Sequence, residues 1–433
     1  MGNSAEPKRF PARKLPSNST PGGNHPAARA SYFHASYFKV FMNDPENESE
    51  QFPTPASELP PQQQTVEPMA AVLPPEPPET RFLKMILFGP NGLRTGCSAA
   101  TFVALAAVFV VLAGTITAAI GSGLFHLKPG HITAASAALS EFSSLLGLLA
   151  AGAIVAAIES RTIARYYLSG PGNLPHFLGG ILGGFLALSL LVGVLYSGGH
   201  LSFGRGTLGP TQILHFGLLW ALMFLFTALF EEGAFRCFLL NILARGMNYW
   251  WAAGSVAFLC LFALLNSSSN GGAGVYTMAL LGCLPCLLVH LKKLPDSGFW
   301  QAAWFTSTAF GYVHTFNDGE SRIGILSAAS IGFVFCVSIR LTGSAWWAIG
   351  FHGAWDWAQT FFYGTPDSGL PAQGHYLTTT PIGAAFWSGG SDGPEGSVLV
   401  LPIVILILLA LLVLYRRRPG LESPSPAAQA QLS

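Results

Sequence analysis

The chain has 433 residues, of which 51% are hydrophobic and only 10% are charged, and its formal net charge is +1. No basic stripe and no Gly-rich phosphate loop occurs, so the composition and motifs exclude a nucleic-acid partner and a phosphate-loop enzyme. The predicted fold class is an all-α, polytopic helical membrane protein with about 8–10 transmembrane helices.

The first 80 residues differ in composition from the rest of the chain. They are rich in Pro, Ser, Asn and Gln, begin with basic residues and end in an acidic stretch around Asp44–Glu79. Such a segment cannot bury enough apolar surface to fold, so we expect a disordered tail. It has no apolar run after its basic start, which argues against a cleavable signal peptide. The first membrane span would then direct insertion.

Long apolar runs follow. Ala99–Ile120 and Val398–Tyr415 each provide roughly the 20 residues that cross a bilayer core. Two of the runs between them, Trp251–Leu265 and Phe299–His314, are short for a full crossing and could be re-entrant. The other predicted spans are Thr133–Ile158, Phe177–Tyr196, Ile213–Leu243, Val275–His290, Ile323–Ile339 and Ala345–Phe362.

Positive charge is distributed unevenly between the two sides that these spans define. Only Lys128, Arg205 and Arg322 fall on the side opposite the N-terminus. The side of the N-terminus carries Arg81, Lys84, Arg94, Arg161, Arg165, Arg245, Lys292, Lys293, Arg340, Arg416, Arg417 and Arg418. By the positive-inside rule, we expect a multi-pass protein of the plasma or inner membrane with both termini in the cytoplasm.

Three polar clusters lie inside apolar stretches. They are Glu231-Glu232-x-x-x-Arg236, Phe310-x-x-x-His314 and His352-x-x-x-Asp356. A single ionisable side chain facing lipid costs roughly 3 kcal/mol at the bilayer centre. These side chains must therefore pair with one another or line a wet cavity.

Helical spacing suggests different roles for the two adjacent glutamates. Glu232 and Arg236 are four residues apart, so they share a helical face and can form an ion pair. Glu231 points about 100° away and lacks this partner, which makes it the better candidate for a general base. His352 and Asp356 have the same spacing of four residues. With His314, these residue types suit the activation of water, directly or through a divalent metal.

The three motifs, in this order, resemble those of the CPBP (Abi) family of intramembrane endopeptidases. That family includes the type II CAAX prenyl protease and bacterial bacteriocin-processing and immunity proteins, and the resemblance covers roughly residues 210–365. It implies that Glu231 activates water with the help of His314, and that His352 and Asp356 stabilise the oxyanion or help to bind a metal. Many relatives have Asn at the last position; Asp356 cannot donate as an Asn amide does, so it would orient His352 or bind a metal.

Two mechanisms remain open within this resemblance. Zinc bound by Glu231, His314 and His352 would leave a fourth position for water, and the usual label is metalloprotease. A glutamate-dependent mechanism without metal uses the same atoms and is slightly preferred, since the chain has no His-Glu-x-x-His motif. The implied partners are the bilayer and a membrane-embedded or lipid-anchored peptide.

Other classes of function use the same residues. A proton- or ion-coupled transporter could use Glu141, the Glu232–Arg236 pair and the histidines, although the sequence shows no inverted repeat. A non-catalytic scaffold or immunity protein would not need Glu231.

We expect six segments along the chain. They are a tail (1–80), N-terminal transmembrane helices (81–209), a catalytic core (210–365), a loop (366–394), a last transmembrane helix (395–418) and a cytoplasmic tail (419–433). The segment Gly364–Pro394, rich in Gly, Pro, Ser and Thr, could be a lid, but we expect a solvated linker.

Overall fold

The computed structural model describes residues 82, 84–85, 87–89, 92–124, 133–266, 283–317, 320–367 and 374–415. The predicted disordered tail (1–80), the C-terminal tail (419–433) and the first half of the Val275–His290 span lie outside these residues.

The described residues are mainly helical, which confirms the predicted fold class. The long helices are α2 (Thr95–Leu124), α3 (Ala134–Ile158), α4 (Asn173–Ser197), α5 (Pro210–Glu232), α7 (Tyr249–Asn266), α9 (Ser297–Val313), α10 (Arg322–Thr342), α11 (Trp346–Trp357) and α13 (Val400–Leu414). Shorter helical segments are η1 (Ile163–Arg165), η2 (Gly233–Leu239), α6 (Leu240–Ala244), η3 (His314–Phe316), η4 (Ala358–Phe362), α12 (Ala385–Ser388), η5 (Gly390–Asp392) and η6 (Pro394–Gly396). Residues 283–291 are also helical.

Five helical stretches among the described residues are long and apolar enough to cross a membrane. They are Thr95–Ile120, Ala134–Ile158, Asn173–Ser197, Pro210–Ala244 and Arg322–Thr342. Helix α13 has 15 residues and α9 has 17, both fewer than the roughly 20 that a full crossing needs. The chain is therefore an integral membrane protein with helices of two length classes.

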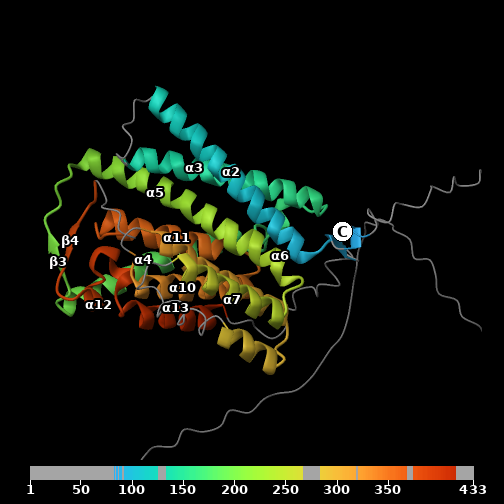
Figure 1. The fold of residues 1–433 in the computed structure, drawn as a ribbon. Coiled ribbons are helices and arrows are strands. Elements are labelled where there is room, and N and C mark those ends of the chain that lie inside the picture. The colour runs from blue at the N-terminus through green and yellow to red at the C-terminus, as the bar shows by residue number, and fades with distance from the viewer. Residues whose placement is uncertain are drawn as a thin grey trace, which may run out of the picture. The chain divides into compact units, whose positions relative to one another are not determined.

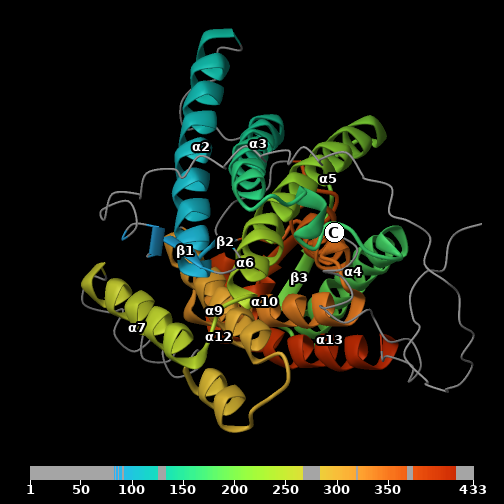
Figure 2. The same cartoon turned by 90° about the vertical axis from the view of Figure 1, so that its right-hand side faces the viewer.

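Helix α5 lies between α3 and α11, whereas α2 lies at the edge of the bundle beside α3 (Figures 1 and 2). None of the most apolar window of α2 is buried. The core consists mainly of two apolar clusters. In the first, Phe102 of α2 stacks against Phe238 of η2. In the second, Phe335 of α10 packs against Phe351 of α11.

Glycines bring α4 and α11 into close contact. A Cβ atom at Gly180 would lie 2.2 Å from the carbonyl oxygen of Trp347, and one at Gly184 would lie 2.2 Å from that of Phe351. Small residues permit such backbone approach between membrane helices, where lipid supplies no hydrophobic driving force. This contact holds α11, which carries His352 and Asp356, against the rest of the bundle.

The short strands are all antiparallel pairs at the ends of helices. β1 (Phe88–Gly89) pairs with β2 (Gly92–Leu93), and β3 (Leu201–Gly204) pairs with β4 (Thr378–Pro381). The β3–β4 pair ties the loop after α11 to the end of α4.

The prediction of a solvated linker before α13 is wrong for the end of this segment, where Ser388 and residues 392–394 are buried, whereas residues 382–387 are exposed. Asp392 is only 1% exposed, and Ser397 is fully buried. A tight turn with positive φ at Gly389, Gly390 and Gly393 folds this segment onto the helices. A Cβ at Gly393 would lie 2.1 Å from the carbonyl oxygen of Pro366, so the packing is close.

Candidate active site

Two of the three polar clusters lie where an α-helix changes to a π-helix. α5 ends at Glu232 and continues as the π-helical segment η2, and α11 passes into the π-helical segment η4 one residue after Asp356. The extra residue per turn changes the direction of the side chains that follow, and such segments are frequent at functional sites. The sequence contained no recognised signal for them.

A chain of three ionisable groups forms the centre of the site. The Nε atom of Arg236 lies 3.3 Å from Oε2 of Glu232, and both side chains are fully buried. The other carboxylate oxygen of Glu232, Oε1, lies 2.9 Å from Nδ1 of His352. Glu232 thus links Arg236 on η2 to His352 on α11.

Aromatic rings surround the guanidinium group of Arg236. Its Cζ lies 3.9 Å from the ring centroid of Phe310 and 5.6 Å from that of Phe335. At these distances the ring faces attract the cation. The phenylalanine of the Phe310-x-x-x-His314 motif therefore supports the arginine of the first motif, a relation that the sequence did not indicate.

The second ring nitrogen of His352 faces two further carboxylates. Nε2 lies 3.3 Å from Oδ2 of Asp356 and 3.7 Å from Oε2 of Glu231. The side chain of Glu231 is 27% exposed, whereas that of Glu232 is fully buried. Glu231 is consequently the member of the glutamate pair that is open at the protein surface, whereas Glu232 is enclosed in the protein interior.

His314 begins η3 at the C-terminal end of α9. Its Nδ1 lies 2.7 Å from the carbonyl oxygen of Phe310. A carbonyl oxygen only accepts hydrogen bonds, so Nδ1 carries the proton, and Nε2 of the neutral ring is left as an acceptor. Among the described residues, the ring makes no hydrogen bond or ion pair to Glu231, His352 or Asp356.

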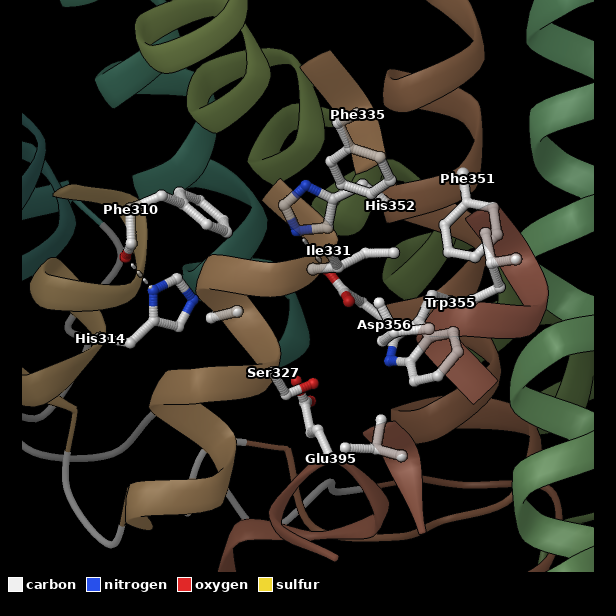
Figure 3. A pocket seen from close by; sticks show the side chains of 14 residues that line it. Phe310, His314, Ser327, Ile331, Phe335, Phe351, His352, Trp355, Asp356 and Glu395 are labelled. Carbon is white, nitrogen blue, oxygen red and sulfur yellow. Dashed lines mark hydrogen bonds and ion pairs between the residues drawn. The ribbon is translucent and has the colours of Figure 1, made fainter. Parts of the chain in front are cut away.

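A pocket of about 490 Å³, a volume that includes space open to solvent, lies beside these residues. His314, His352 and Asp356 all line it, and Figure 3 shows His352 beside Asp356, with His314 apart from them at the left. Glu231 borders His352 but is not among the lining residues. Most of the wall is apolar and comes from Phe310, Ala328, Ile331, Phe335, Phe351, Trp355, Val400, Val404 and Ile407. The structure thus places a polar centre in an apolar pocket.

Glu395 also lines this pocket, and the sequence analysis missed it (Figure 3). Its Oε1 accepts a hydrogen bond of 2.5 Å from Nε2 of Gln359, and its carboxyl group is hydrogen-bonded to Asp367. Burial raises the pKa of Glu395 well above its usual value, and the nearby charges of Asp367 and Asp356 raise it further. Burial also raises the pKa of Asp367. Glu395 stands far from the three motifs in sequence, so no local spacing pointed to it.

The donor arrangement does not fit a preformed zinc site. Among the described residues, no three His, Cys, Asp or Glu side chains converge as ligands, and this includes Glu231, His314 and His352.

One comparison with known proteins identifies a related family. The family described as type II CAAX prenyl endopeptidase Rce1-like matches residues 286–358. The matched segment contains His314, His352 and Asp356, and it begins after the Glu231–Arg236 cluster, which lies outside it. No curated protein and no solved structure matches the chain. The match confirms the resemblance to the CPBP and CAAX proteases and supports, in general terms, a CAAX-protease-like intramembrane endopeptidase.

Proposed function

We propose that this protein hydrolyses peptide bonds of membrane-embedded or lipid-anchored substrates, with water activated by Glu231 and His314 and the oxyanion stabilised by His352. The observation that carries the proposal is the pocket itself. Two imidazoles and Asp356 face an apolar cavity and are backed by the buried Arg236–Glu232 pair. A peptide bond that entered this cavity would lie against His314 and His352, with Glu231 3.7 Å behind Nε2 of His352, away from bulk water.

Glu231 acts as the general base in this proposal. It takes a proton from a water molecule while the water oxygen bonds to the carbonyl carbon of the substrate, and the carbonyl oxygen becomes negative. The C–N bond then breaks, and the proton passes from Glu231 to the leaving amine. General base catalysis of this kind contributes typically about 10²–10⁴-fold to the rate.

His314 orients the attacking water. Since its Nδ1 proton is held by the carbonyl oxygen of Phe310, its Nε2 can accept the second hydrogen of the water. The ring of His314 packs edge-on against Phe310 at a centroid distance of 4.6 Å, which restricts its rotation.

His352 stabilises the oxyanion. Both of its ring nitrogens face carboxylate oxygens, so the protonated ring donates from Nδ1 to Glu232 and from Nε2 to Asp356 in the resting enzyme. During the reaction the Nε2–H group donates to the substrate oxyanion instead. Removing one preorganised donor of this type from an acyl-transfer enzyme raises the activation free energy by about 3–4 kcal/mol. Arg236 and Glu232 keep the ring in place.

The charge distribution along the sequence further supports an orientation with both termini in the cytoplasm, in the plasma or inner membrane. The apolar walls of the pocket suit a substrate segment that is itself apolar.

The test compares new peptide termini in the membrane proteome of cells that express the wild-type chain, Glu231→Gln or Glu141→Gln at matched levels. Glu141 lies on α3 within a predicted span and has no role in the proposed cleavage. We expect fragments with the wild type and Glu141→Gln, and their loss with Glu231→Gln. Identical fragment profiles in all three would reject proteolysis. If ion uptake instead fell in both variants, the protein would be a transporter.

A further inference from the structure

Arg236 is the largest fully buried side chain in the described structure, yet few polar contacts hold it. Its Nε, Nη1 and Nη2 atoms are buried without a hydrogen-bond partner, and the ion pair with Glu232 is 3.3 Å long. The position of the guanidinium group must therefore depend on the shape of the surrounding side chains as well as on charge.

Gly332 of α10 provides part of that shape. A Cβ atom at Gly332 would lie 2.4 Å from Nη2 of Arg236 and 3.4 Å from Cδ1 of Phe310. Ordinary contacts begin at 3.4 Å, so an alanine here would require a displacement of about 1 Å at Nη2. The guanidinium group is confined on the other side by the ring of Phe310, 3.9 Å from Cζ.

We propose that Gly332 is a positioning residue of the active site, because its missing side chain leaves the space in which Arg236 stacks on Phe310 and pairs with Glu232. This inference rests on the proposed endopeptidase function. Gly332 belongs to none of the three sequence motifs, and it acts on the reaction only through Arg236.

The effect of Gly332 reaches the reacting atoms through two contacts. Arg236 holds Oε2 of Glu232, and Oε1 of the same carboxylate holds Nδ1 of His352 at 2.9 Å. A displaced guanidinium group would rotate the Glu232 carboxylate and with it the imidazole that faces the substrate. A misplacement of about 1 Å in a catalytic group can lower the rate about 100-fold.

The experiment uses the full-length protein in detergent or liposomes and compares Gly332→Ala with Gly193→Ala. Gly193 lies in α4, and a Cβ atom there would meet nothing within 4 Å. Both substitutions replace a helical glycine by the better helix former, so only the collision with Arg236 differs. We expect kcat to fall about 100-fold in Gly332→Ala, with KM changed less than about threefold, and no loss in Gly193→Ala.

A second variant separates positioning from a general packing defect. Lysine keeps the positive charge of Arg236 but lacks the two terminal nitrogens that would collide with a new Cβ atom. We expect the double variant Gly332→Ala/Arg236→Lys to recover about tenfold of the activity lost in Gly332→Ala. Equal kcat values for Gly332→Ala and Gly193→Ala would overturn the inference, and so would a double variant no more active than Gly332→Ala.

A wild-type protein without peptidase activity would reject the proposed function, and thermal unfolding of the same variants would then decide the inference. Gly332→Ala should lower the unfolding temperature relative to Gly193→Ala, and Arg236→Lys should restore it in the double variant. Unfolding temperatures that show no such rescue would overturn the steric role of Gly332.

Discussion

Replacing Arg236 by methionine tests how far the buried ion pair stabilises the fold. The change leaves the carboxylate of Glu232, which is fully buried, without its cationic partner. Breaking a buried pair by removing one member costs about 3–5 kcal/mol. The contact between Glu232 and His352 offsets part of that cost, whereas loss of the cation–π contact with Phe310 adds about 0.5–2 kcal/mol. We therefore expect a loss of about 3–5 kcal/mol in the free energy of unfolding.

The measurement is equilibrium unfolding in mixed micelles, followed by tryptophan fluorescence. Arg340→Met is the matched control, since Arg340 pairs with Asp296 through side chains that are 36% and 49% exposed. Exposed pairs contribute at most about 1 kcal/mol. Similar losses in the two variants would refute the reasoning that burial makes the Arg236 pair important.

Three other outcomes are expected. His314→Asn should lower kcat/KM about tenfold, because the Nε2 atom that accepts a hydrogen bond from the attacking water is lost, while His215→Asn on the exposed face of α5 should keep wild-type cleavage of a reporter peptide. The thermal unfolding temperature should fall as pH rises from about 4 to 8. The pKa values of Asp367 and Glu395 are raised in the folded chain above their values of 3.8 and 4.5 in the unfolded chain. The folded chain therefore binds these two protons more tightly than the unfolded chain does. This stabilisation is fully present below the unfolded values and is lost as pH rises through the folded ones, so Glu395→Gln should flatten the profile, and an unchanged slope would contradict the assignment. Gly180→Ala should destabilise the protein by about 1–3 kcal/mol in the same unfolding assay, because its Cβ would overlap the carbonyl oxygen of Trp347, and a neutral effect would show that α4 can move away from α11.

Local spacing along the helices accounts for the parts of the site that could be predicted. Residues four apart lie on one face of a helix, so the motif letters alone indicated that Glu232 can pair with Arg236 and that His352 lies beside Asp356. The structure has both contacts, at 3.3 Å each. The same geometry separated Glu231 from Glu232, and the two side chains differ in exposure as that separation suggests.

The relations between helices could not be predicted in this way. The contact from Glu232 to His352, the ring of Phe310 beneath Arg236 and the space at Gly332 all join residues that are far apart in sequence. In a soluble protein, an apolar stripe would have shown which face of each helix points inward. A membrane helix is apolar on all sides, because lipid and protein interior are both apolar, so the stripe is absent.

The burial of the loop before α13 could not be predicted from the sequence either. Its Gly-, Pro- and Ser-rich composition indicated a solvated linker, since such residues are common in loops. In the structure Asp392 is buried, and Glu395 reaches the pocket next to Asp356. Composition describes the flexibility of the isolated segment, whereas its burial depends on hydrogen bonds to Gln359 and on close packing at Gly393.

The sequence by itself determined that this is a helical membrane protein, because apolar runs long enough to span a bilayer are unstable in water. It also determined that the three polar clusters lie inside the protein, because ionisable side chains are unstable in lipid. Only the tertiary structure decided that Glu232 is buried between Arg236 and His352, whereas the side chain of Glu231 is partly exposed. It also decided that Gly332 and Glu395 border the same centre. The order of the residues decides which side chains meet within one helical turn. Contacts between helices depend on the packing of the whole bundle.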